Sequence, residues 1–251
     1  MIVEYHRPQT LDEALALISR EDPVTVPLGG GTVLNQPSPD PIAVVDLQSL
    51  ELSGFERRGK YLDFGAMITL QSLLEIPELP PSLDKAIRHE ATNNQRQVAT
   101  LAGTIVACDG RSAIATTFLA LDAQVHIEPG GVNIGLGDIL PKRTTLLKGS
   151  LITQVTIPTS PLLAYQYVAR TPEDLPIVCV AVGKWESGRI RVVLGGHGDA
   201  PRLAMDGTGS EGAEMAAEDA YSQASDEWAS AEYRMHVAGV LTNRCLDDLS
   251  S

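Results

Sequence analysis

Residues 24–34 read Val24-Thr-Val-Pro-Leu-Gly-Gly-Gly-Thr-Val-Leu34, a short β-branched run that ends in three consecutive glycines. Glycine has no Cβ and tolerates positive φ, so successive N–H groups of such a loop can turn toward an anion and approach it closely. The alternative interpretation is a tight turn between two strands, because glycine is first of all a turn residue. The stretch therefore predicts a phosphate-binding loop or a turn.

The two glycine-rich fingerprints with a known mechanism do not fit this loop. The Walker pattern ends in Gly-Lys-Ser/Thr, whereas this loop ends in Gly31-Thr32-Val33. The dinucleotide fingerprint opens a helix, but three prolines between Asn35 and Pro41 prevent a helix there. A phosphate bound here would lie in a fold that is neither a P-loop nor a Rossmann fold.

The composition is that of a globular chain. With 251 residues, 43% hydrophobic and 20% charged, the chain can bury a sizeable core. Its net charge of −13 argues against binding a polyanion such as nucleic acid. The apolar runs are too short for a membrane span and the first residues lack the pattern of a signal peptide, so we expect a cytoplasmic protein.

The cysteines and histidines do not predict a metal site. Cys108, Cys179 and Cys245 lie far apart and form no C-x-x-C pair, so they cannot build an iron–sulfur cluster or a zinc site by themselves. We expect them to be buried small apolar residues. The five histidines are equally scattered, with no pair at i, i+4 spacing.

Periodicity and capping signals indicate where the helices and strands lie. Thr10-Leu-Asp-Glu13 is a capping box, and the apolar residues that follow predict a helix over 10–20. Further helices are expected at 82–92, 112–123 and 231–246, and strands at 2–5, 24–26, 42–46, 61–70, 124–127, 151–157, 165–170, 177–185 and 189–194. Gly54–Lys60 is interpreted as a linker, and 203–230 as an acidic solvated segment with a mobile glycine-rich part.

Seven stretches in register resemble a known family. They are Leu28–Thr32, Phe64–Leu70, Arg96–Ile105, Phe118–Ala123, Leu151–Pro158, Tyr165–Arg170 with Leu194–Gly196, and Glu232–Arg234 with Leu241–Leu246. In this order they resemble the flavin-binding subunit of the molybdenum hydroxylases, which is the medium subunit of carbon monoxide dehydrogenase and the equivalent domain of xanthine dehydrogenase.

The resemblance implies an α+β fold in two parts. Residues 1–160 would form a two-subdomain FAD-binding fold of the vanillyl-alcohol-oxidase (PCMH) type, with subdomains 1–54 and 55–160. Residues 161–251 would form a small α+β C-terminal domain with a three-stranded antiparallel sheet. The implied function is an oxidoreductase subunit that carries FAD, without a catalytic acid or base and without a metal of its own. Electrons would come from a molybdopterin-containing large subunit through an iron–sulfur subunit and leave to an acceptor.

The resemblance also assigns the flavin site. The first glycine loop would bind the pyrophosphate through backbone N–H groups, a second loop would complete the clamp, and a later strand would line the apolar surroundings. The assigned residues are Leu28, Gly29, Gly30, Gly31, Thr32, Val33, Leu34, Gly65, Ala66, Thr100, Ala102, Gly103, Thr104, Val106, Leu151 and Ile152. On this assignment Gly30→Val should abolish FAD binding and leave a folded chain.

The chain departs from the family pattern at several positions. Ala102 and Thr104 replace a glycine and an asparagine, Val33 and Ala113 replace acidic residues, and Gln166 replaces a lysine. A lost charge-assisted hydrogen bond is worth roughly 1.5–3 kcal/mol. A second hypothesis is therefore a flavin-free paralogue that serves as an assembly subunit, and a free-standing flavin oxidase is a third.

Overall fold

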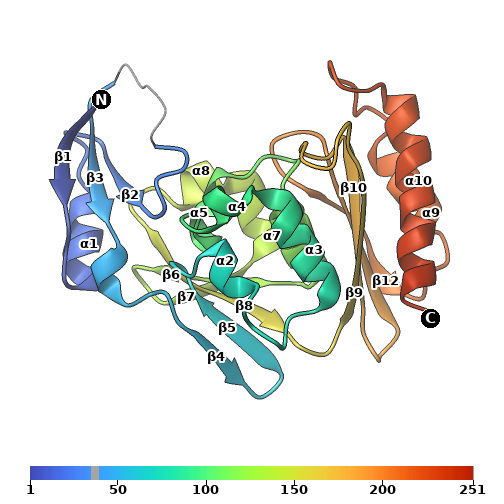
Figure 1. The fold of residues 1–251 in the computed structure, drawn as a ribbon, viewed down its shortest axis with the longest axis horizontal. Coiled ribbons are helices and arrows are strands. Elements are labelled where there is room, and N and C mark those ends of the chain that lie inside the picture. The colour runs from blue at the N-terminus through green and yellow to red at the C-terminus, as the bar shows by residue number, and fades with distance from the viewer. Residues whose placement is uncertain (35–39, 251) are drawn as a thin grey trace. The chain divides into compact units, whose positions relative to one another are not determined.

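Two compact units make up the chain, and each is assembled from segments that are not contiguous in sequence (Figure 1). The first unit contains residues 1–75, 93–107 and 124–156, and the second contains 76–92, 108–123 and 157–251. The computed structural model describes residues 1–34 and 40–250. The prediction that no helix follows the glycine loop therefore falls largely outside the described residues.

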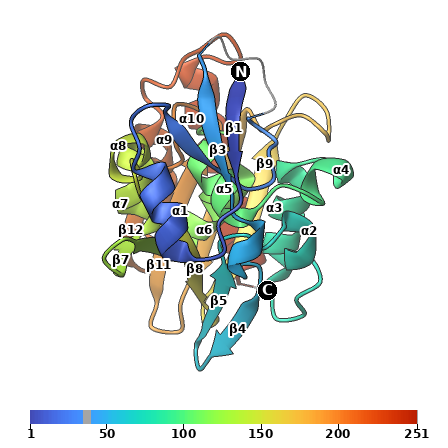
Figure 2. The same ribbon diagram turned by 90° about the vertical axis from the view of Figure 1, so that its left-hand side faces the viewer.

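A small parallel sheet opens the first unit. Its strands are β1 (Ile2–His6), β2 (Thr25–Leu28) and β3 (Ile42–Asp46), in the order β1-β3-β2. Helix α1 (Leu11–Ile18) connects β1 to β2 and lies beside the sheet in Figure 2. The side chain of Thr10 caps α1 by accepting the N–H of Glu13 at 3.3 Å, as the capping box predicts. Ala14 and Ile18 of α1 pack against Val45.

The second sheet of the first unit has five strands in the order β4-β5-β8-β6-β7. They are β4 (Phe55–Arg58), β5 (Tyr61–Gly65), β6 (Gln124–Glu128), β7 (Val132–Gly135) and β8 (Leu151–Pro158). The short helices of the unit are η1 (Gln48–Leu50), α2 (Leu70–Leu73), α4 (Asn93–Arg96), α5 (Leu101–Ala107), α7 (Leu136–Ile139), η2 (Leu140–Lys142) and α8 (Arg143–Leu146).

The prediction of a linker at Gly54–Lys60 is wrong, because β4 lies there. All four residues of β4 are exposed, so the alternation of buried and exposed residues that signals a strand is missing. Pairing with β5 stabilises the strand instead, and Gly59, with φ +61°, makes the turn between them.

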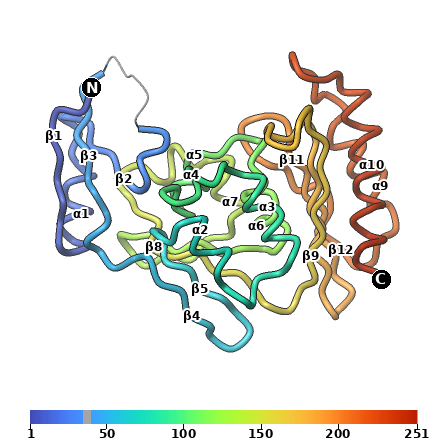
Figure 3. The backbone as a smooth tube through the Cα atoms, in the orientation of Figure 1, coloured from blue at the N-terminus to red at the C-terminus, as the bar shows by residue number. Residues whose placement is uncertain are grey.

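An antiparallel sheet of four strands organises the second unit, in the order β12-β11-β10-β9. The strands are β9 (Leu162–Val168), β10 (Val178–Lys184), β11 (Arg189–Gly195) and β12 (Arg202–Thr208). Helices α3 (Pro81–Glu90) and α6 (Ala113–Ala120) cover one face, and α9 (Ala213–Ala220) and α10 (Ala231–Asp248) cover the other (Figures 1 and 3). Because helices cover both faces, six consecutive residues of β10 are buried.

The α+β class is confirmed, but the C-terminal sheet has four strands rather than three. Strand β12 and helix α9 lie in the stretch 203–230 that the sequence predicts to be a solvated segment. Strand β12 is at the edge of the sheet and none of its residues is fully buried, so its sequence lacks a clear alternation of apolar and polar residues although its backbone pairs with β11. The expected helices over 10–20, 82–92, 112–123 and 231–246 are confirmed with slightly different ends.

The division into domains at residue 160 stays a prediction. In the structure, α3 and α6 precede that residue and belong to the second unit, where they pack against the sheet of later strands. None of the helices in residues 1–34 and 40–250 combines the length and the apolarity that a membrane crossing requires.

Candidate functional site

A cavity of about 350 Å³ lies in the first unit next to the glycine loop. Its walls come from the end of β2 and the loop after it, from the ends of β3 and β5, from α5, and from the start of β8. The residues that line it are Val26, Pro27, Gly29, Gly30, Gly31, Thr32, Val33, Leu34, Leu47, Ala66, Met67, Thr100, Ala102, Gly103, Val106, Ala107, Leu147, Ser150, Leu151 and Ile152.

The structure brings most of the predicted site residues together around this cavity, but three do not line it. Leu28 ends β2. Gly65 meets another part of the backbone, since a Cβ there would lie 2.2 Å from the carbonyl oxygen of Leu52. The Thr104 hydroxyl donates to the carbonyl of Thr100 at 2.9 Å. Each of the three therefore has a role within the fold.

Sequence reasoning missed seven lining residues: Val26, Pro27, Leu47, Met67, Ala107, Leu147 and Ser150. Val26 and Pro27 directly precede the glycine loop, and Met67, Ala107 and Ser150 are direct neighbours of predicted residues, so proximity in sequence could have found these five. Leu47 and Leu147 have no such signal, because only the tertiary fold brings them to the cavity.

Close backbone packing explains the glycines of the loop. A Cβ on Gly30 would lie 1.7 Å from the carbonyl oxygen of Val98, so only glycine fits there. Gly31 has φ +69°, a left-handed conformation that favours glycine. The N–H groups of Gly29 to Thr32 donate to no acceptor in the part of the chain that the structure describes. These four donors are available for an anion.

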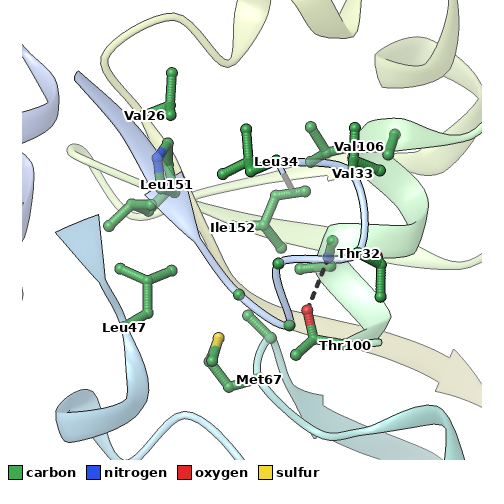
Figure 4. Close-up of a pocket in the computed structure, with 18 of the residues that line it drawn as sticks. Val26, Thr32, Val33, Leu34, Leu47, Met67, Thr100, Val106, Leu151 and Ile152 are labelled. Atoms are coloured by element: carbon green, nitrogen blue, oxygen red, sulfur yellow. Dashed lines mark hydrogen bonds between the residues drawn. The ribbon is translucent and has the colours of Figure 1, made fainter. Parts of the chain in front are cut away.

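Thr100 lines the cavity, and its neighbours form hydrogen bonds with the segment between β5 and α2. The N–H of Leu101 donates to the backbone carbonyl of Ile68 at 2.9 Å, and the N–H of Ala102 donates to the backbone carbonyl of Ala66 at 3.1 Å. The buried Thr100 hydroxyl accepts the N–H of Gly103 at 3.2 Å (Figure 4). The segment that the sequence suggests as a second loop is therefore the capped start of α5, because these bonds begin a helix at Leu101.

The walls of the cavity are apolar and carry no charge. Thr32, Thr100 and Ser150 supply the polar side chains, and no lining residue in the described ranges is acidic or basic. Figure 4 shows Ile152 between Leu47 and Met67 on one side and Leu34 and Val106 on the other. The residues present thus fit a ligand that combines an anionic group, held by backbone N–H groups, with a large apolar part.

The departures from the family pattern are distributed over both units. Ala102 and Val33 line the cavity. Ala113 is buried at the start of α6 in the second unit. Gln166, also in the second unit, donates to Asp248 at 2.7 Å and accepts from Lys85 at 3.3 Å, so its amide is engaged by its own neighbours.

Comparisons with known proteins agree along the whole chain. Residues 1–160 match the model of the FAD-binding domain in molybdopterin dehydrogenase. The chain is 28% identical to the nicotine 6-hydroxylase medium subunit of Paenarthrobacter nicotinovorans, covering 97% of this chain and 96% of that protein. It is 26% identical to the carbon monoxide dehydrogenase medium chain of Afipia carboxidovorans, covering 97% and 95%. Its fold matches a chain of the reconstituted CO dehydrogenase from Oligotropha carboxidovorans with a TM-score of 0.83 and 25% identity, covering 97% and 96%.

Proposed function

The chain belongs to the family of FAD-binding domains of molybdopterin dehydrogenases, and from this premise we propose that its glycine-loop cavity holds FAD in the flavoprotein subunit of a molybdenum hydroxylase complex. Membership in the family confirms the resemblance found in the sequence. The family identifies FAD as the cofactor and oxidoreduction as the chemistry of the parent enzyme.

The observation that supports this site is the row of four backbone N–H groups that donate to no described residue, beside a largely apolar cavity. The N–H groups of Gly29 to Thr32 would bind the pyrophosphate, and the absence of a Cβ at Gly31 lets it approach. Leu151 and Ile152 would pack against the apolar part of the cofactor and exclude water from it. When bound, FAD supplies the redox chemistry, so the chain's own residues bind and orient.

The remaining parts of the function concern the complex. We propose that a molybdopterin-containing large subunit and an iron–sulfur subunit deliver electrons to this chain, which passes them to an acceptor. The relatives support this, because two of them are a medium subunit and a medium chain. We place the complex in the cytoplasm, since the three cysteines are buried and form no disulfide among the described residues, as a reducing compartment allows.

The alternative is a flavin-free paralogue that acts as a structural subunit. Two observations favour it: no charged side chain lines the cavity among the described residues, and the Thr104 hydroxyl is occupied by the carbonyl of Thr100. Under this hypothesis, the cavity would have lost the side-chain contacts of the family and kept only the backbone ones.

The absorption spectrum of the purified chain, recorded before and after adding excess FAD and again after gel filtration, tests the proposal. We expect the bands of oxidised flavin to remain with the protein. The same measurement on the co-purified complex determines whether partner subunits are needed to retain the flavin. A colourless chain in a colourless complex would contradict the flavoprotein function and favour the structural one.

A further inference from the structure

An exposed tryptophan in the second unit lies against two arginines, and this cluster has no part in the flavin site. Trp228 is 39% exposed. The guanidinium carbon of Arg111 lies 4.8 Å from the ring centroid and that of Arg170 lies 4.4 Å from it. The three side chains come from the segment before α6, the segment after β9 and the segment before α10, so only the fold of the second unit assembles them.

The segment that presents Trp228 is held by an ion pair between the partly exposed Asp226 and the buried Arg234. The carboxylate of Asp226 accepts the N–H groups of Trp228 and Ala229 at 2.8 and 3.1 Å. The fully buried Arg234 donates to both oxygens of that carboxylate at 2.9 Å, and to the carbonyl of Ala224 at 2.7 Å. Trp228 is therefore preorganised, which lowers the entropic cost of binding a partner.

Neither arginine forms an ion pair with a carboxylate among the residues that the structure describes. Arg111 donates to the backbone carbonyls of Pro176 and Leu175 at 3.0 and 2.5 Å, which fixes its position. Arg170 makes no hydrogen bond or ion pair with any described residue. The neighbouring acidic side chain of Asp174 accepts the N–H of Thr171 instead. Donors of both guanidinium groups therefore stay available, although acidic residues outnumber basic ones, 32 to 19.

We propose that Trp228, Arg111 and Arg170 form a docking surface for an acidic segment of a partner protein. A carboxylate of that segment would accept hydrogen bonds from the two guanidinium groups, which form the strongest hydrogen bonds available to it. The carbon stem of the same side chain would contact the part of the indole that the two arginines leave exposed. Tryptophan and arginine together are the residues that dominate binding energy at protein interfaces.

The fluorescence of Trp228 tests this surface directly. Trp185→Phe removes the second tryptophan of the chain and keeps an aromatic ring under Arg189. In this background, we expect titration with a capped hexaglutamate peptide to change the emission of Trp228 in a saturable way. Arg170→Gln should raise the Kd about tenfold, the loss of one charge-assisted interaction. Arg170→Lys should recover part of the affinity.

The matched control is Lys142→Gln, which removes an exposed positive charge in the first unit and should leave the Kd unchanged. An equal loss of affinity in the Lys142 and Arg170 variants would overturn the proposal, because it would show a response to net charge alone. So would an equal response to hexalysine or to inorganic phosphate, or no saturable response to hexaglutamate.

Discussion

At the scale of single residues, Gly30 shows that one glycine can serve the fold and the site together. Its Cα lies so close to the carbonyl of Val98 that a Cβ would approach that oxygen to 1.7 Å. The expectation that Gly30→Val leaves an intact chain therefore needs revision, because the side chain would meet backbone before it met any ligand.

Gly30→Ala should lower the free energy of unfolding by about 1–3 kcal/mol, since the added methyl group overpacks a rigid backbone contact. Denaturant unfolding measures this loss, and the flavin content should fall with it. Gly54→Ala is the control: nothing lies within 4 Å of its Cβ position, so the stability should change by less than about 0.5 kcal/mol. Equal stabilities of the two variants would contradict the packing described at Gly30.

Thr100 provides a second residue-scale prediction. Its hydroxyl accepts the N–H of Gly103 in the first turn of α5. Thr100→Val keeps the shape of the side chain and removes this cap, so we expect a loss of about 1 kcal/mol in unfolding free energy. Thr100→Ser keeps the hydroxyl and should retain most of the stability. If both variants lose the same amount, the methyl contacts rather than the hydrogen bond stabilise this turn.

At the scale of elements, helix α6 begins against a carboxyl group from another helix. Glu90, at the end of α3, accepts the N–H of Ile114 at 2.9 Å and the hydroxyl of Ser112 at 3.0 Å. Burial raises the pKa of Glu90 to about 7, although these hydrogen bonds favour its charged form. The packing of α3 beside α6 therefore couples the stability of this helix pair to pH.

The sign of this pH dependence follows from the raised pKa of Glu90. The folded chain binds the proton more tightly than the unfolded chain, so the stabilisation is complete below the unfolded pKa near 4.5 and is lost as the pH rises through about 7. We expect the free energy of unfolding to fall by about 2–3 kcal/mol from this group between pH 5 and 8.

Glu90→Gln keeps an acceptor for Ile114 and removes the titration. Subtracting the unfolding free energies of this variant from those of the unchanged protein at each pH isolates the contribution of Glu90. A difference that is constant between pH 5 and 8 would contradict the raised pKa.

At the scale of the whole molecule, the charge of the chain and the neutrality of its cavity predict how salt affects flavin binding. The net charge is −13, and no charged side chain lines the described cavity. FAD is itself an anion, so salt should screen a repulsion rather than an attraction. The Kd for FAD should therefore stay constant or decrease between about 50 and 500 mM NaCl. A tenfold weaker affinity at the higher concentration, measured by flavin fluorescence, would reveal a cationic contact with the phosphates.

Local signals in the sequence determined most helices and strands of both units. The capping box at Thr10 and the apolar run before Gly29 depend on neighbours within a few residues, so they could be recognised without the fold. The glycine loop and the start of β8 could also be recognised locally, and the order of the family-like stretches assigned both to one cofactor site. The family match over residues 1–160 confirms the resemblance on which that assignment was made.

Tertiary structure decided what had no local signal. Strands β4 and β12 have no fully buried residue and no clear alternation in their sequences, and they are strands because a neighbouring strand pairs with their backbones. Leu47 and Leu147 reach the cavity from connections far from the glycine loop, and Trp228 meets Arg111 and Arg170 only across the folded second unit. Sequence patterns indicate which side chains are buried and where the backbone turns locally. The contacts between distant segments arise from packing. These contacts form both the cavity and the docking surface around Trp228.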